Sequence, residues 1–412
     1  MAPKSKENRT IVLPILEEGY SRFISDGPYA RSVIEDQYGQ YPELFPSGMD
    51  RFVLNGKSRR SRKSGYQLRK IRVEGQSYRI RPAFLLSYHR GCSVEASKGL
   101  LLLRFGVPFW ALSHVLGHSQ MWWYRLFVSL GEFNLVGTTV YQADQMPKDL
   151  LADEKHIIRR GKKAYIATTV GQDCILGSEA AALASQAHLE PAYAVFKQEA
   201  RRLDPAYFPQ SVNTDGWHAT QNSWRELFPT IVIIECFLHA FLKIRDRATK
   251  ALQDYFDAIA DKVWNLYQAP NKRSLAQQTR RLREYLQEQV PESQMKKKGL
   301  KLCQKTYRWM AHLDHPHAHR TSNMLDRVMK FMNRHARNAQ TLHGSLQATS
   351  KNFRAFALIY NFSPYSPQTQ NKHQNKTSPV HKLNSRVYHQ DWFYNLNIAA
   401  SLGGNRHHRN PG

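Results

Sequence analysis

From residue 148 onward, apolar positions change from a strand-like period to a helix-like period and back. The segments KDLLADEK, KKAYIATTVG and CILGS predict three successive strands, and LASQAHLEPAYAVFKQEARRL predicts a helix. SVNTDGW then predicts a short strand that ends at Asp215, HATQNSWRELFP a helix, and TIVIIEC a buried strand. Strands and helices in this order indicate a mixed α/β sheet that is covered by helices.

Helical spacing dominates after the last of these strands. Apolar residues recur at helical spacing through 241–310 and again in 321–340, so we expect an all-helical insertion followed by one strong helix. After Pro364 the composition turns polar, which indicates a linker or loop. The segment WFYNLNIAASLGG near the end is apolar enough to pack against the rest of the protein.

Residues 94–131 predict three short helices. The first ends at Phe105-Gly106, Pro108 suits the first turn of the second, and Gly117 can end the second in a left-handed conformation. Ser119 can cap the third helix. Two short helices joined by a tight glycine turn are a helix-turn-helix candidate for DNA binding, and a helical hairpin that only packs is the alternative. The side chains that the third helix would expose are Gln120, Tyr124 or Arg125.

Residues 57–72, KSRRSRKSGYQLRKIR, carry eight Lys or Arg. The first half contains Ser and Gly and is typical of a flexible arm, whereas RKIRVEGQSYRIR predicts a short hairpin. Because Lys and Arg bind phosphates without fixed geometry, we interpret this stretch as a DNA contact, and a solvated edge strand is the alternative. The residues expected to contact DNA are Arg59, Arg60, Arg62, Lys63, Arg69, Lys70 and Arg72.

The overall charge indicates a polyanionic partner. Lys and Arg number 59 and Asp and Glu 33 among 412 residues, an excess of +26. Nucleic acid is favoured over an anionic membrane, because no basic stretch has the bulky apolar face that membrane insertion needs. No apolar run approaches the roughly 20 residues of a membrane span. The N-terminus lacks an apolar signal core and the four cysteines form no CxxC pair, so we expect a cytoplasmic protein.

Three aspartates could meet at one edge of the predicted sheet. Asp153 lies on the first strand, Asp215 ends the fourth strand just before Gly216, and Asp326 lies early in the helix after the insertion. Two-metal phosphoryl transfer needs several carboxylates at one point, and Mg²⁺ prefers oxygen ligands. Taken singly, such aspartates are usually helix caps or solvated groups, so the hypothesis of a metal site depends on all three.

On these segments the chain resembles the DDE/DDD family of bacterial insertion-sequence transposases, which have an RNase H-like catalytic core. It resembles more distantly the Mutator-like and hAT transposases, which carry a helical insertion. The block TDGWHATQNSWRELFP is the most specific part of the likeness, and TSNMLDR fits the family's final acidic helix. The matching segments lie within residues 148–362, roughly half of the chain.

The resemblance implies that Asp153, Asp215 and Asp326 are catalytic and bind two Mg²⁺ or Mn²⁺ ions, for hydrolysis and then strand transfer at transposon ends. The third acid is commonly Glu in such families, so Asp314 and Glu292 remain alternatives for Asp326, and Asp149 for Asp153. Lys330 on the final helix is expected to contact DNA. Cys236 and His239 match the family's CxxH; they are either adjacent to the site or a buried thiol beside a hydrogen-bonded histidine.

The predicted fold class is therefore α/β, with an RNase H-like mixed sheet that has helices on both faces and an all-helical insertion. An N-terminal helical, helix-turn-helix-like DNA-binding region precedes it. We expect double-stranded DNA as the partner, at least a homodimer on it, no membrane, and association with a prokaryotic nucleoid. The rival functions are an RNase H-fold nuclease without strand transfer and a non-catalytic, transposase-derived DNA-binding protein. The expected divisions are 1–83, 84–142, 143–240, 241–310, 311–364 and a tail at 365–412.

Overall fold

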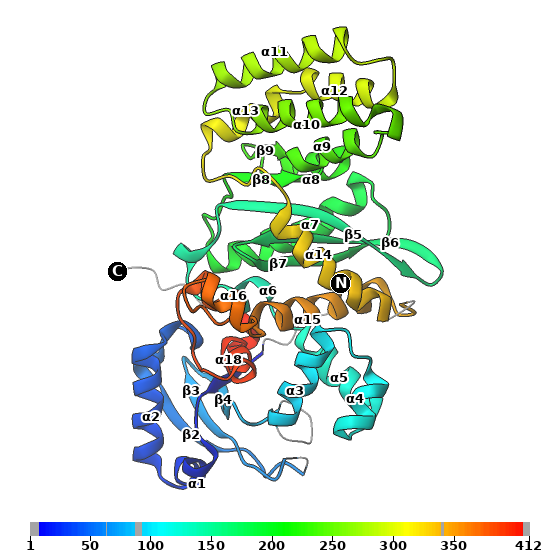
Figure 1. The fold of residues 1–412 in the computed structure, drawn as a ribbon. Coiled ribbons are helices and arrows are strands. Elements are labelled where there is room, and N and C mark those ends of the chain that lie inside the picture. The colour runs from blue at the N-terminus through cyan, green and yellow to red at the C-terminus, as the bar shows by residue number, and fades with distance from the viewer. Residues whose placement is uncertain (1–7, 63, 87–92, 339–341, 407–412) are drawn as a thin grey trace.

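The computed structural model describes residues 8–62, 64–86, 93–338 and 342–406, and its largest sheet has five strands (Figure 1). The first three strands are antiparallel neighbours, and the other two run parallel to the first, so that the order across the sheet is β7-β6-β5-β8-β9. All five strands lie where the apolar pattern predicts them. They are β5 (Asp149–Arg159), β6 (Lys162–Gly171), β7 (Cys174–Ala181), β8 (Ser211–Thr214) and β9 (Val232–Glu235).

Helices cover both faces of this sheet. Leu150 and Ala152 on β5 pack into one core with α7 (Gln186–Leu203) and α8 (His218–Leu227). Leu151 and Ile157 belong to a second core, because successive strand residues point to opposite faces. That core contains α14 (Asn323–Asn338) and α15 (Leu346–Phe362). The protein is thus a mixed α/β protein, as expected.

A second, four-stranded sheet contains the predicted basic hairpin. Its order is β1-β4-β3-β2, and β1 pairs in parallel with β4. The hairpin turns at Glu74 and Gly75, which both have positive φ, the conformation that two-residue hairpin turns favour. This sheet and its two helices make a larger folded unit than a hairpin. The elements are β1 (Thr10–Leu13), α1 (Glu17–Ser25), α2 (Gly27–Gln40), β2 (Val53–Lys57), β3 (Arg69–Val73) and β4 (Gln76–Pro82).

The three helices predicted in 94–131 are present as α3 (Ser93–Arg104), α4 (Phe109–Leu116) and α5 (Gln120–Leu130), and α6 (Leu135–Thr139) follows. Gly117 has φ +73° where α4 ends. The side chain of Ser119 accepts a hydrogen bond from the backbone N–H of Trp122 at 3.2 Å. Both turn residues therefore act as the sequence predicts.

The predicted insertion is all helical and has a hydrophobic core of its own. It forms the end of the molecule that carries α10 and α11 in Figure 1. Because α9 follows β9 directly, the helical block begins slightly earlier than residue 241. Its helices are α9 (Phe237–Arg245), α10 (Gln253–Tyr267), α11 (Lys272–Glu288), α12 (Gln294–Gln304) and α13 (Tyr307–Asp314).

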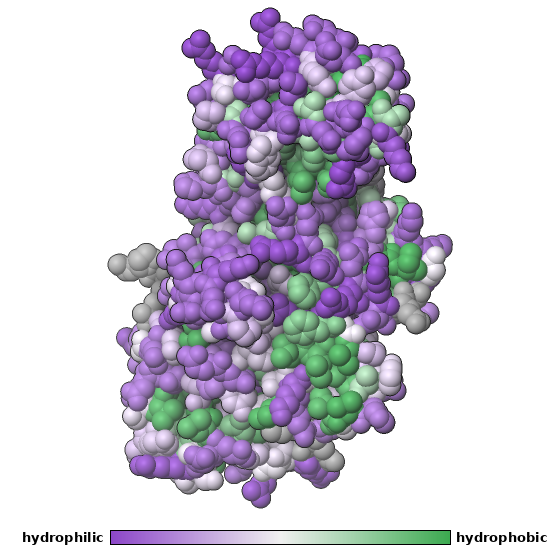
Figure 2. Space-filling view, in the orientation of Figure 1, coloured by the Kyte–Doolittle hydropathy of each residue, from purple (hydrophilic) through white to green (hydrophobic). Residues whose placement is uncertain are grey.

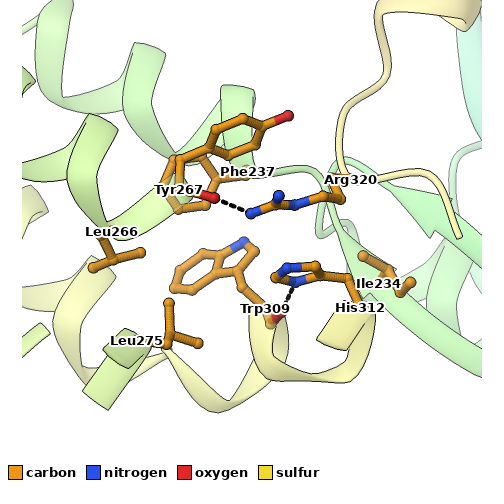
Figure 3. A pocket seen from close by; sticks show the side chains of 8 residues that line it. All are labelled: Ile234, Phe237, Leu266, Tyr267, Leu275, Trp309, His312 and Arg320. Carbon is orange, nitrogen blue, oxygen red and sulfur yellow. Dashed lines mark hydrogen bonds between the residues drawn. The ribbon is translucent and has the colours of Figure 1, made fainter. Parts of the chain in front are cut away.

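A small cavity of about 10 Å³ lies where the insertion joins β9 (Figure 3). Arg320 donates a hydrogen bond to the carbonyl of Tyr267, and its guanidinium lies 4.1 Å from the centroid of the Tyr267 ring. Trp309 Nε1 and His312 Nε2 are buried here with no hydrogen-bond partner among the described residues. A cavity of this size holds about one water molecule, so we interpret it as a water site at the junction of the insertion and the sheet and not as a substrate site.

The interpretation of the residues after Pro364 as a linker or loop is wrong. They form α16 (Pro367–Lys372), α17 (Pro379–Asn384) and α18 (Trp392–Ala399), and most of α17 and α18 is buried. Asn384 accepts from the backbone N–H of Tyr141 at 2.8 Å and donates to the carbonyl of Thr139 at 2.9 Å. The Ser-Pro pairs that begin α16 and α17 supply an N-cap followed by proline in the first turn, a helix start within a polar composition.

In the described part of the chain, no helix is both long and apolar enough to cross a membrane.

Candidate metal and nucleic-acid site

Asp153 lies near the middle of β5, on the face that α14 covers. The two-residue period of the strand puts it on the same side as Leu151 and Ile157. The neighbouring Glu154 points to the other face, where its carboxylate accepts hydrogen bonds from Tyr193 at 2.6 Å and Thr220 at 2.7 Å. Glu154 therefore connects β5 to α7 and α8, and Asp153 is the acid on the α14 side of the strand.

Asp215 follows the last residue of β8, and Gly216 has φ +91°, so the chain turns sharply after the acid. Its carboxylate accepts from the backbone N–H of Trp217 at 2.9 Å. Burial raises the pKa of Asp153 to about 7, and the charges of Asp215 and Glu154 add to this effect. The first two predicted metal ligands thus lie close enough to repel each other.

Asp326 is exposed in the first turn of α14, and its carboxylate accepts a hydrogen bond from the Ser322 hydroxyl at 2.9 Å. It is coupled electrostatically to His239 in α9, which also feels the charge of Asp215. The charges of Asp326 and Asp215 therefore act on the same histidine. Within the described ranges, however, no three Asp, Glu, His or Cys side chains are near enough to one another to hold a single ion.

Cys236 and His239 interact with each other at the start of α9. Hydrogen bonding of its ring N–H to the sulfur of Cys236 raises the pKa of His239 to about 8, against the lowering effect of burial. Burial alone would raise the pKa of the Cys236 thiol, but hydrogen bonds with His239 and Ser322 lower it below its usual value. Cys236 Sγ also accepts from the backbone N–H of Ser322 at 3.3 Å. Cys236 is thus linked through Ser322 to Asp326, which supports the interpretation that this pair is adjacent to the site.

The alternative acids lie in other surroundings. Asp149 accepts a hydrogen bond from Ser211 at 2.6 Å, at the opposite end of β8 from Asp215. Asp314 and Glu292, both in the insertion region, form ion pairs with Lys272 at 2.7 Å and Lys296 at 2.9 Å. None of the three appears among the charges that act on Asp153.

Glu235 is an acid near the site that the sequence analysis missed. It ends β9 and pairs in register with Thr214, the residue before Asp215. Its carboxylate accepts from Gln221 at 3.3 Å and forms an ion pair with Arg308 of the insertion. The carboxyl ends of neighbouring parallel strands meet at one edge, and this rule would have identified it. Because Arg308 already neutralises Glu235, we expect a positioning role for it.

The basic arm gives a mixed result for the predicted DNA contacts. Arg59, Arg60 and Arg62 are exposed in the loop between β2 and β3, and Lys63 lies outside the described residues. Arg69 does not fit a DNA contact, because its guanidinium is buried and donates to the carbonyls of Phe23 at 2.8 Å and Ile24 at 2.6 Å. It holds the end of α1.

Lys70 and Arg72 lie on the outer face of this small sheet, since they alternate with the buried Ile71 and Val73. The exposed Arg79 of β4 pairs directly with Lys70. Like charges directly opposite each other are unfavourable unless an anion covers them, so Arg79 belongs with the predicted phosphate contacts. The two-residue period of RKIRV and YRIR could have identified it.

Gln120 and Arg125 are exposed on α5 as predicted, but the surface around them is largely apolar. Large hydrophobic side chains are exposed along α3 to α5, and they are Val94, Leu102, Phe105, Trp110, Val115, Met121 and Tyr124. Figure 2 shows this hydrophobic area where α3 and α5 lie in Figure 1. Protein–DNA interfaces are polar and strongly basic, so this surface favours a packing role over a reading helix.

No family model matches the chain, and no curated protein matches it.

Proposed function

We propose that this chain is a DNA transposase that cleaves and joins phosphodiester bonds with divalent metal ions held by Asp153, Asp215 and Asp326. The observation that carries the proposal is the pair Asp153 and Asp215 on neighbouring parallel strands. Burial and the charge of Asp215 raise the pKa of Asp153 to about 7. Half-buried carboxylates that repel each other are unfavourable alone and favourable around a cation, which is typical of a functional site.

The sheet supports an RNase H-like catalytic core. Three antiparallel strands are followed by two strands parallel to the first, and α14 packs on β5 after a helical insertion. The acids then lie on the first strand of this sheet, after its fourth strand and on α14, the helix that follows the insertion. This is the arrangement that the resemblance to insertion-sequence transposases implies.

The donor set fits the proposed ions, because Mg²⁺ and Mn²⁺ prefer oxygen ligands such as carboxylates. Ions held by these acids would activate a water or a DNA 3′-hydroxyl and neutralise charge at the reacting phosphate. Since the three acids do not yet converge on a single point, we expect Asp326 to exchange its hydrogen bond with Ser322 for the ion.

The proposal is tested with labelled DNA that carries the ends flanking this gene, in Mg²⁺ or Mn²⁺. We expect metal-dependent nicking by the wild type and a loss of about a hundredfold or more in Asp215→Asn, with DNA binding retained. The matched control is Asp144→Asn, which neutralises an exposed aspartate outside the site and should leave nicking unchanged.

Each other outcome selects a different function. Equal nicking by wild type and Asp215→Asn contradicts the site. Binding without cleavage in either protein favours a non-catalytic DNA-binding protein. Nicking without joining of the labelled end into a target plasmid favours a nuclease.

A further inference from the structure

The exposed side of α14 carries Asp326 and then only neutral or basic residues. Lys330 and Arg337 lie on the same side of the helix as Asp326, and the opposite side buries Leu325 and Val328. At about 1.5 Å per residue, the stretch from Asp326 to Arg337 is roughly 16 Å long. That is about five nucleotides of duplex at ~3.4 Å each. The helix therefore offers a basic stripe that starts at a proposed metal ligand.

The stripe continues onto the β5–β6 hairpin. Lys155 lies two residues after Asp153, so it shares the face of β5 on which α14 packs. In Figure 1, α14 crosses the sheet toward the end of this hairpin. The backbone N–H of Arg160 at the hairpin tip donates to the carbonyl of Leu342 at 3.0 Å, which fixes the tip beside the chain that follows α14.

Two further cations lie at this tip. Lys162 and Lys163 are exposed, and Lys162 is directly opposite Arg159 in the register. Of the two, Lys162 lies on the α14 side of the sheet, because its partner Arg159 shares the face of Asp153 and Lys155. We define the α14 track as Lys155, Lys330, Arg337 and Lys162.

Within the described ranges, no member of the α14 track forms an ion pair with an acidic side chain. Neighbouring cations without counter-charges repel one another, and a polyanion relieves the repulsion. An acidic protein segment would also supply negative charge. The track begins beside acids proposed to act on a phosphodiester, however, and this favours a nucleic-acid backbone.

We propose that the α14 track binds the sugar-phosphate backbone of the DNA on one side of the bond to be cut, and that it sets how the strand enters between Asp153 and Asp326. The path of the DNA strand toward Asp153 and Asp326 rests on the proposed function. The binding of DNA by the track does not depend on catalysis. The contacts are to phosphates, so they add affinity and register without reading bases.

Binding of a fluorescently labelled duplex of mixed sequence tests the track, in EDTA and over a series of NaCl concentrations. We expect Lys330→Gln/Arg337→Gln to weaken binding about tenfold or more at low salt and to reduce the slope of log affinity against log salt by about 2. Lys162→Gln, at the exposed hairpin tip, should also weaken binding and reduce the slope by about 1, with α14 unchanged. The matched control is Arg201→Gln/Arg202→Gln, which removes the same charge from the exposed end of α7, on the other face of the sheet.

If neither track variant changed the slope of log affinity against log salt, the inference would be overturned. It would also be overturned if the α7 control lost as much DNA affinity as the α14 variant, because the net charge of the protein would then explain both losses. Thermal unfolding of each variant shows whether weaker DNA binding comes from a loss of folded structure. If the α14 variant is unfolded, the hairpin variant tests the track in its place. Because EDTA prevents metal-dependent cleavage, a failed track leaves the effect of Asp215→Asn on nicking intact. Inactive wild-type protein with a functional track would instead contradict the proposed function alone.

Discussion

Replacing Arg354 with leucine should lower the free energy of unfolding by about 3–5 kcal/mol, because the buried Glu199 and the partly buried Glu179 lose their counter-charge. Arg354 lies in α15 and donates to Glu179 on β7 at 2.7 Å and to Glu199 on α7 at 2.5 Å. Its guanidinium also donates to the carbonyls of Gly131 at 3.3 Å and Phe133 at 2.7 Å. Urea unfolding followed by far-UV circular dichroism at neutral pH measures the change.

The size of this effect follows from the number of elements that the cluster of Arg354, Glu179 and Glu199 joins. Glu199 accepts from the backbone N–H groups of Leu135 at 2.8 Å and Val136 at 3.1 Å, at the start of α6. Burial alone would lower the pKa of Arg354, but Glu199 and Glu179 raise it above its ordinary value. One guanidinium therefore connects both helical layers to an edge strand of the sheet.

Two variants bracket this prediction. Arg354→Lys keeps the charge and loses the planar fork, so its loss of stability should be intermediate. Arg245→Leu breaks an exposed ion pair with Asp246 and should change stability by less than about 0.5 kcal/mol. If Arg354→Leu were no more destabilised than Arg245→Leu, the cluster would not hold the layers together.

The elements with strong periodicity were predictable from the sequence. The five strands of the large sheet, α7, α8 and α14 lie where apolar residues recur with the right period. Gly117 and Ser119 predicted the turn before α5, because only a few residue types suit a left-handed turn or an N-cap. Local chemistry was enough for these features.

Features that depend on distant contacts were not predictable. The sequence around Arg69 resembles an exposed basic stretch, and the sequence around Arg354 resembles a helix of mixed composition. Their burial is explained only by distant partners, which are backbone carbonyls for Arg69 and acidic side chains for Arg354. The polar residues after Pro364 fold because Asn384 and its neighbours find partners across the molecule. Average composition cannot identify such satisfied polar groups.

The candidate site lies between these two cases. The alternation of β5 and the turn at Gly216 are local, so Asp153 and Asp215 could be chosen from the sequence. Two other features depend on how the helices pack and could not be predicted from the sequence. Glu154 is hydrogen-bonded on the other face of the sheet, and Asp326 accepts a hydrogen bond from Ser322, which lies beside Cys236. The spacing of Cys236 and His239 predicted a pair but not its effect on the pKa of either residue.

Metal binding and proton binding should compete at Asp153. Since its pKa in the folded protein is about 7, against 3.8 ordinarily, the stability that this group contributes is complete below about pH 4 and is lost as the pH rises through 7. Without metal, Asp153→Asn should therefore stabilise the protein at pH 8, by about 1–4 kcal/mol at ~1.4 kcal/mol per pKa unit. Thermal unfolding in EDTA at pH 5 and pH 8 measures the difference between variant and wild type.

The same titration should govern the response to Mn²⁺. Below pH 7 the affinity of the wild type should fall about tenfold per pH unit, because one proton must leave for the ion to bind. Asp153→Asn should lose most of the Mn²⁺-induced rise in melting temperature, whereas the surface control Asp144→Asn should keep it. An equal rise in Asp153→Asn would contradict a ligand role for Asp153. Stabilisation by the substitution in EDTA would then reflect only the cost of a buried charge and its repulsion with Asp215, so the two measurements separate metal binding from the electrostatics of the folded protein.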